Sequence, residues 1–103
     1  METNSIIKVS ISTYGTVNLE AGWTSKEVSL PRQSATVEDV LHSVKLMDGR
    51  AVFDLIADKS GIRESYGIWL NGRVLSDRTA LHTRLKNEDQ IAIGSSIRAI
   101  GGG

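Results

Sequence analysis

The hydrophobic residues of this chain change their spacing part of the way along it, and this change restricts the fold more than any other feature. From Ile6 to Tyr14 apolar and polar residues alternate, which is typical of a strand with one buried face. Further on, apolar residues recur at intervals of three and four, along one side of a helix: Val37, Val40, Leu41 and Val44. The pattern therefore predicts an α+β domain with a helix packed on one face of a sheet.

Four further segments are expected to be strands, because apolar residues alternate in them or turn residues bound them: Thr24–Leu30, Tyr66–Leu70, Arg73–Leu75 and Gln90–Ile93. Between the second and third of these, Asn71-Gly72 is the strongest short signal for a tight hairpin. Glu20–Gly22 predicts a turn that joins the first two strands of the chain, with a loop too long to fix their register. Ser76–Leu85 is expected to be irregular or a single helical turn.

The ends of the helices are predicted from capping residues. Thr36 followed by Asp39 resembles a capping box, and Asp48-Gly49 is expected to end the main helix. A second, shorter apolar stripe predicts a short second helix: Val52, Leu55 and Ile56. Asp48 is its expected N-cap and Gly61 its expected stop.

Composition narrows the classes of protein that fit. A chain of 103 residues with 40% hydrophobic and 23% charged residues is expected to form one packed domain. Its 12 basic and 12 acidic residues cancel, so no charge pattern points to nucleic acid or an anionic membrane. The chain has no cysteine, which excludes disulfides and thiol catalysis. With no signal peptide or apolar run long enough to cross a bilayer, a cytoplasmic location is expected.

The sequence shows no combination of residues that would make it an enzyme. His42 and His82 lie forty positions apart, and neither has a partner at the spacing of a metal or catalytic site. No serine lies in a nucleophile elbow, and Lys59-Ser60 lacks the upstream glycine of a phosphate-binding loop. We therefore expect no catalytic residue, no metal site and no bound cofactor.

Trp69 is the first of two features that point to function. Alternation within Tyr66–Asn71 places Ile68 and Leu70 toward the helix and Trp69 on the other face of the sheet. A large aromatic residue on an open sheet face is a candidate for contact with a partner, because tryptophan is enriched at binding hot spots. The alternative interpretation is that Trp69 lies along the sheet and covers its own neighbours.

The second feature is the end of the sequence, where Gly101, Gly102 and Gly103 form a run of glycines. Without side chains, such a tail has nothing to bury and is expected to be flexible. A terminal glycine carboxylate can enter a narrow channel, and a partner enzyme that adenylates it with ATP would make it a good electrophile. The alternative interpretation is that the three glycines are slack.

Several short motifs, taken in order along nearly the whole chain, resemble the ubiquitin-like β-grasp family: Thr36–Leu41, Gly61-Ile62, Trp69–Gly72, Leu85–Gln90 and the final Gly102-Gly103. Within that family the chain is most similar to the small subunit of molybdopterin synthase (MoaD), the thiamine-pathway carrier (ThiS) and the small archaeal modifier proteins. It departs from the MoaD type, because Gly94–Ser96 stands where those carriers have an aromatic-Pro-Pro stretch. It also has extra length between Lys45 and Gly61.

The resemblance implies a β-grasp fold, with a mixed sheet of four to five strands packed on one main helix plus a short second helix. Residues 1–98 would form this domain and residues 99–103 the flexible tail. An E1-like enzyme would use ATP to adenylate Gly103, while Gly102 and Gly101 thread its channel. Trp69 falls where ubiquitin carries its exposed recognition isoleucine. Trp69 is expected to bind the partner, as is Arg98, in a segment that resembles the ends of thiamine-type carriers and archaeal modifiers.

Three functions follow as alternatives. In the first, the chain is a sulfur carrier whose Gly103 becomes a thiocarboxylate and donates sulfur to a synthase in thiamine, molybdopterin or tRNA thiolation chemistry. In the second, the same activated glycine is joined to lysines of target proteins. In the third, the domain binds a partner without covalent chemistry and the glycines are incidental. The sequence leaves open whether Gly103 is the encoded end or the product of processing.

Overall fold

Five strands form one mixed sheet in the computed structural model, which describes residues 6–75 and 79–95. They are β1 (Ile6–Thr13), β2 (Ser25–Pro31), β5 (Tyr66–Leu70), β6 (Arg73–Leu75) and β7 (Gln90–Ser95), in the spatial order β2-β1-β7-β5-β6. β1 and β7 are parallel, and the other neighbouring strands are antiparallel. A separate small ribbon pairs β3 (Ala57–Asp58) with β4 (Gly61–Ile62).

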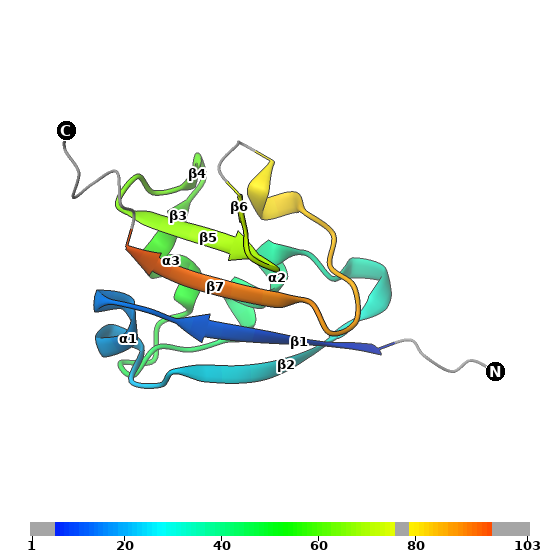
Figure 1. Cartoon of the computed structure of the whole chain (residues 1–103), viewed down its shortest axis with the longest axis horizontal. Coiled ribbons are helices and arrows are strands. Elements are labelled where there is room, and N and C mark those ends of the chain that lie inside the picture. The colour runs from blue at the N-terminus through cyan, green and yellow to red at the C-terminus, as the bar shows by residue number, and fades with distance from the viewer. Residues whose placement is uncertain (1–5, 76–78, 96–103) are drawn as a thin grey trace.

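Helices cover one face of this sheet and leave the other open (Figure 1). The main helix is α2 (Val37–Ser43), and the short second helix is α3 (Val52–Ile56). A further helix, α1 (Thr16–Ala21), lies between β1 and β2, and two 3₁₀ turns occupy Arg32–Ser34 and Ala80–His82. The predicted α+β architecture, a sheet packed on one main helix plus a short second one, is confirmed.

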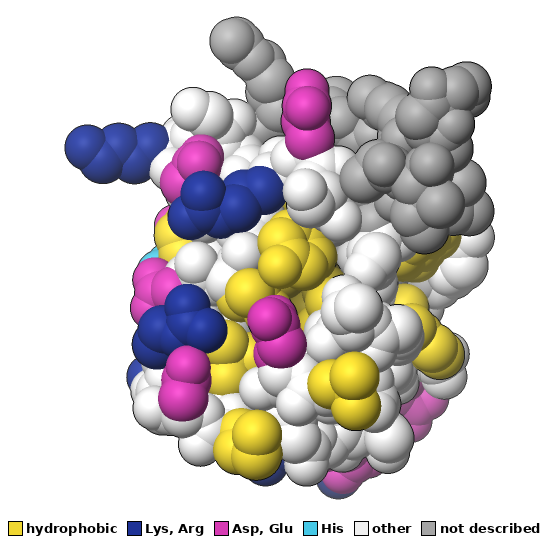
Figure 2. Space-filling model, turned by 90° about the vertical axis from the view of Figure 1, so that its left-hand side faces the viewer, with side chains coloured by type: hydrophobic (Ala, Val, Ile, Leu, Met, Phe, Trp, Pro, Cys, Tyr) yellow, Lys and Arg dark blue, Asp and Glu magenta, His cyan; other side chains and the backbone are white. Residues whose placement is uncertain are grey.

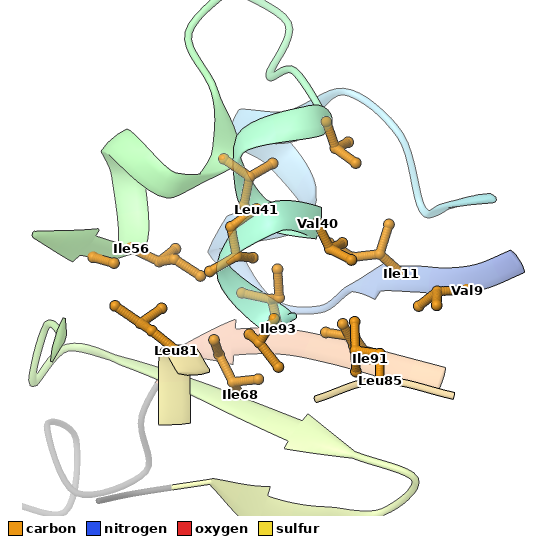
Figure 3. Close-up of a cluster of buried hydrophobic side chains, with 14 of the residues drawn as sticks. Val9, Ile11, Val40, Leu41, Ile56, Ile68, Leu81, Leu85, Ile91 and Ile93 are labelled. Atoms are coloured by element: carbon orange, nitrogen blue, oxygen red, sulfur yellow. The ribbon is translucent and has the colours of Figure 1, made fainter. Parts of the chain in front are cut away.

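The core lies between α2 and the sheet (Figure 3). The alternation of β1 places three residues inside, and the stripe of α2 faces them, so that both periods predicted from the sequence bury their apolar sides. Strands β5 and β7 complete the other wall. The most buried of these side chains are Ile7, Val9, Ile11, Val37, Val40, Leu41, Ile68, Ile91 and Ile93, each at most 1% exposed.

The predicted start of α2 is confirmed, but the predicted end is wrong. The Asp39 backbone N–H donates to Thr36 Oγ1 at 3.3 Å, and the Thr36 backbone N–H donates to Asp39 Oδ2 at 3.1 Å, which completes a capping box. The helix stops at Ser43, because Val44 is already extended and its carbonyl accepts a hydrogen bond from the Val52 backbone N–H. The buried Val44 therefore belongs to the core without belonging to the helix.

Asp48 and Gly61 do not bound α3 as predicted. The N-cap of α3 is Ala51, which has no side chain that could accept a capping hydrogen bond. Asp48 instead accepts hydrogen bonds from the backbone and guanidinium of Arg50, within a turn that also contains Gly49. Gly61 lies in β4, beyond the end of the helix. Burial of Val52 and Ile56, rather than capping, fixes this helix.

The two predicted hairpins differ in outcome. Asn71 and Gly72, with φ of 52° and 86°, turn β5 tightly into β6, as predicted. β1 and β2 are paired as expected, but the connection is not a simple turn at Glu20–Gly22. The first two of those residues belong to α1, and Gly22 closes the helix with φ 82°.

Candidate functional site: an open sheet face beside the start of the tail

Trp69 lies on the face of the sheet that no helix covers. Its neighbour Ile68 is completely buried, and Leu70 packs against the core, so the alternation predicted for β5 is confirmed. Trp69 pairs with Ala92 of β7 on one side and with Val74 of β6 on the other. The indole is half-buried, and Val74 is 52% exposed. An apolar row thus crosses three strands on the open face.

The position of the indole depends on Gly67, whose role the sequence analysis does not predict. Gly67 and Gly94 are paired across β5 and β7. A Cβ atom at Gly67 would lie 2.9 Å from Cη2 of Trp69, too close for any real contact, and one at Gly94 would lie 3.8 Å from Cζ3. The ring therefore lies over Gly67 and beside Gly94. A glycine inside a strand can mark such a close approach, so Gly67 carried a usable signal.

Trp69 consequently satisfies part of both interpretations made from the sequence. The indole is on the open face, as a contact residue requires, and it also covers backbone of its own sheet. Covering Gly67 holds the ring in one place, and a ring held in place loses little conformational entropy when a partner binds. Its role in binding a partner stays a prediction.

A shallow hollow of about 430 Å³ adjoins the indole, and Tyr14 also lines it. The floor is polar, with serines from β1 and β2, while Trp69 and Tyr14 supply apolar surface. Tyr14 is 58% exposed, and its Cβ lies 3.5 Å from the place a Gly94 Cβ would take. The two aromatic residues therefore flank Gly94, near the end of β7.

The strand β7 leads toward the predicted tail. Its last residue, Ser95, shares a hydrogen bond with Thr16 at the start of α1, with 2.8 Å between the hydroxyl oxygens. Arg98 and the three glycines Gly101, Gly102 and Gly103 lie outside the described residues. The structure thus positions the end of β7, beside Tyr14 and α1.

The charged groups of the described residues form small local pairs. Arg50 donates to Asp48 through its backbone N–H and its guanidinium, and these bonds hold the pKa of the Asp48 carboxyl below its usual range. His42 stacks on Phe53 with 4.1 Å between ring centroids and lies 3.6 Å from Glu38. Within residues 6–75 and 79–95, no three His, Cys, Asp or Glu side chains gather as a metal site would require.

No helix in the described parts of the chain is long and apolar enough to span a membrane. The longest, α2, has only seven residues.

Solved structures with the same arrangement identify the class of fold. The HVO 2177 protein of Haloferax volcanii matches with a TM-score of 0.73 and 19% identity, over 92% of this chain and 88% of its own. Small archaeal modifier protein 1 of Methanosarcina acetivorans matches with a TM-score of 0.67 and 24% identity, over 89% and 95%. A candidate molybdopterin converting factor subunit 1 of Pyrococcus furiosus gives 0.63 and 22%, over 86% and 97%. The domain is a ubiquitin-like β-grasp fold, as predicted.

The sequence places the chain within that class. The model of the ThiS family matches residues 14–103, so the chain belongs to the ThiS family. The match includes Trp69 and extends through the three final glycines. No curated protein is similar enough in sequence to count as a match. The resemblance to the ubiquitin-like carriers and small modifiers is thereby confirmed at the level of the family.

Proposed function

We propose that this protein is a sulfur carrier whose Gly103 is adenylated by an E1-like enzyme and then converted to a thiocarboxylate. The observation that carries the proposal is the match to the ThiS family, which extends to the final glycine. The fold supports it, because β7 is the central strand of the sheet and its last residue, Ser95, lies beside α1, with three residues between Ser95 and the predicted tail. The partner enzyme would bind the folded domain, and the tail would carry the reactive carboxylate.

The chemistry needs no catalytic group on this chain. A carboxylate oxygen of Gly103 attacks the α-phosphorus of ATP, which releases pyrophosphate and leaves an acyl-adenylate. Hydrosulfide then attacks the carbonyl carbon, the bond to the AMP oxygen breaks, and a proton is released with AMP. The product is a C-terminal thiocarboxylate. Gly101 and Gly102 would let the reacting carbon pass through a narrow channel, because they have no side chains. ATP is bound by the partner and not by the carrier.

Conjugation to proteins is the second candidate, favoured by the likeness to small archaeal modifier protein 1. It shares the adenylate and differs in the nucleophile, which would be a lysine amine of a target protein. The amine attacks the same carbonyl carbon, AMP leaves, and an isopeptide bond forms. The acceptor therefore separates the two candidates.

Intact-mass spectrometry tests the proposal directly. The chain is incubated with ATP, Mg²⁺, sulfide and the purified E1-like adenylating enzyme of its own organism, with a variant lacking Gly103 as the matched control. The expected result is the mass increase of one oxygen-to-sulfur exchange in the wild-type chain only. Adducts on lysines of other proteins, without that exchange, would assign the chain to the modifiers. Unchanged function in cells after deletion of Gly102 and Gly103 would contradict both candidates and leave a non-covalent binding domain.

Trp69 and Arg98 are proposed to contact the adenylating enzyme. Replacing Trp69 with alanine is expected to weaken the association by about 2 kcal/mol or more, the loss typical of an aromatic hot spot. Trp69→Phe keeps a ring over Gly67 and is expected to weaken the association less than Trp69→Ala does. Arg98→Ala is expected to weaken association without changing the fold. Isothermal titration calorimetry measures the three variants, and unchanged affinity of Trp69→Ala would mean that the indole only covers its sheet.

A further inference from the structure

Exposed apolar side chains collect at the end of the molecule where β7 finishes. Five large apolar side chains of the described residues are more than half exposed: Ile6, Tyr14, Leu19, Met47 and Val74. Three of these five lie in α1 or beside it: Tyr14, Leu19 and Met47. The two most exposed are Leu19 at 74% and Met47 at 73%. Figure 2 shows this end of the molecule, with yellow apolar side chains reaching the surface among charged ones. We call Tyr14, Leu19 and Met47 together the α1 surface.

Contacts around α1 place these residues beside the same short helix. Leu19 and Tyr14 line the same hollow, together with residues of β1 and β2. Met47 lies across Gly22, the C-cap of α1, where a Cβ atom would be 3.1 Å from the Met47 Cβ. Gly22 therefore lets the Met47 side chain rest against the end of the helix, three residues after Leu19.

The α1 surface is held firmly by the core beneath it. Val17 and Ala21, on the opposite side of α1, are at most 1% exposed. The Asn18 side-chain amide donates to Thr13 Oγ1 at 3.2 Å, which ties the helix to the end of β1. A rigid helix of six residues thus exposes its leucine while burying its two smaller apolar residues. An exposed apolar surface on a rigid support is typical of a protein-binding site.

The location of the α1 surface indicates which partner covers it. Thr16, the first residue of α1, shares its hydroxyl hydrogen bond with Ser95, and Gly103 lies eight residues beyond Ser95 in the sequence. Fully extended, eight residues span at most roughly 27 Å. An enzyme that holds Gly103 in its active site must therefore lie close to this end of the domain. Tyr14 also belongs to the hollow beside Trp69, so the α1 surface continues the open face already described.

We propose that the E1-like adenylating enzyme docks on the α1 surface through an apolar patch of its own, and this proposal rests on the proposed function. Leu19 and Met47 fit such a patch, because their side chains are uncharged and exposed. Docking there would fix the direction in which the tail leaves the domain toward the ATP site. The partner would thus bind a wider area than the sheet face around Trp69.

Steady-state adenylation kinetics test this inference with the purified E1-like enzyme of the same organism, by ATP–pyrophosphate exchange at varied carrier concentration. The test variant is Leu19→Ser with Met47→Ser, which leaves the core and the tail unchanged. The matched control is Ile6→Ser, which removes an equally apolar and 61% exposed side chain from the start of β1, at the other end of that strand. Circular dichroism melting checks that all chains are folded.

The expected result is a rise of about tenfold or more in the KM for the carrier in the double variant, with kcat unchanged, as befits loss of a binding contact alone. Ile6→Ser is expected to keep the wild-type KM. Equal KM values for wild type and double variant would overturn the docking proposal and leave the proposed function intact. Absence of exchange with the wild-type chain would overturn both.

Two further experiments test whether something else covers the α1 surface: a second copy of the chain, or the tail of the same chain. Self-association of the wild-type chain, abolished in the double variant and measured by analytical ultracentrifugation, would assign the surface to a second copy and overturn the proposal. Deleting residues 97–103 tests the tail as the occupant. If that deletion shifts the amide NMR signals of Leu19 and Met47 in the isolated chain, the tail covers the surface and the proposal is overturned.

Discussion

The two hairpins of the sheet reach the same kind of strand pairing by different means. Between β5 and β6, two residues with positive φ turn the chain at once, and their backbone preferences define the turn. Between β1 and β2, the connection contains the helix α1, whose buried Val17 and Ala21 fix it against the core. One turn is specified by local chemistry and the other by burial. The β5–β6 turn can therefore be predicted from sequence. In the β1–β2 connection, the residues on the exposed side of α1 can change without loss of the fold.

Replacing Val17 with alanine should have the largest effect on this comparison. Val17 is completely buried beneath α1, so the loss of two methyl groups leaves a cavity and is expected to cost about 2–3 kcal/mol of unfolding free energy. Urea denaturation measures the change. Leu19→Ala, two residues on and exposed, serves as the control and should stay within about 0.5 kcal/mol of wild type. Equal effects would mean that burial does not fix the β1–β2 connection.

Replacing Asn71 with alanine tests the other hairpin. The Asn71 amide donates to the buried Asp89 carboxylate at 2.9 Å, and its oxygen accepts from the Gln90 backbone N–H at 2.8 Å. Losing both bonds is expected to lower the unfolding free energy by about 2 kcal/mol. Asn71→Gly removes the same bonds but keeps the freedom to adopt positive φ. If it is as stable as wild type, the ability to adopt positive φ, rather than the hydrogen bonds, stabilises this turn.

A smaller effect distinguishes the glycines that close the two connections. Gly72 has open space around it, so Gly72→Ala should cost only the strain of positive φ, about 1 kcal/mol. Gly22→Ala should cost more, because its new methyl group also meets Met47. In the background of Met47→Ala, part of this excess should disappear, a coupling of about 0.5 kcal/mol in a double-mutant cycle. An identical cost at Gly22 in both backgrounds would exclude the contacts with Sδ and Cγ of Met47 as its cause.

Much of the fold could be predicted because local signals agree with burial. The alternation of Ile6–Thr13, the capping box at Thr36 and the Asn71-Gly72 turn each involve residues a few positions apart. The predictions are wrong where contacts between residues far apart in the sequence determine the local structure. α2 ends at Ser43 because Val44 turns away to bond with Val52, and no local stop signal marks that position. α1 was missed because six residues are too few to show a helical period.

The candidate site was predictable in part for the same reason. Alternation alone places Trp69 on the open face, and Gly67, two residues before it, marks where its ring lies, but Gly94 comes beside the ring only when β5 and β7 pair. Tyr14, Leu19 and Met47 come together only through the packing of α1. The tail glycines are evident in the sequence itself, and residues 96–103 lie outside the described structure. Their chemistry rests on the family and on the proposed experiments.

The position of β7 has a consequence for how the protein is made. This strand lies at the centre of the sheet and pairs in parallel with β1. Ser10, near one end of the sequence, is thereby paired with Gln90, near the other. Such distant pairing slows folding, and here it waits for the last strand to be synthesised. A chain that stops before Gln90 would contain two unjoined hairpins and no tail. Early termination would thus prevent folding as well as remove the final glycines. Under the proposed function, such truncated chains would be exposed to proteolysis instead of occupying the adenylating enzyme.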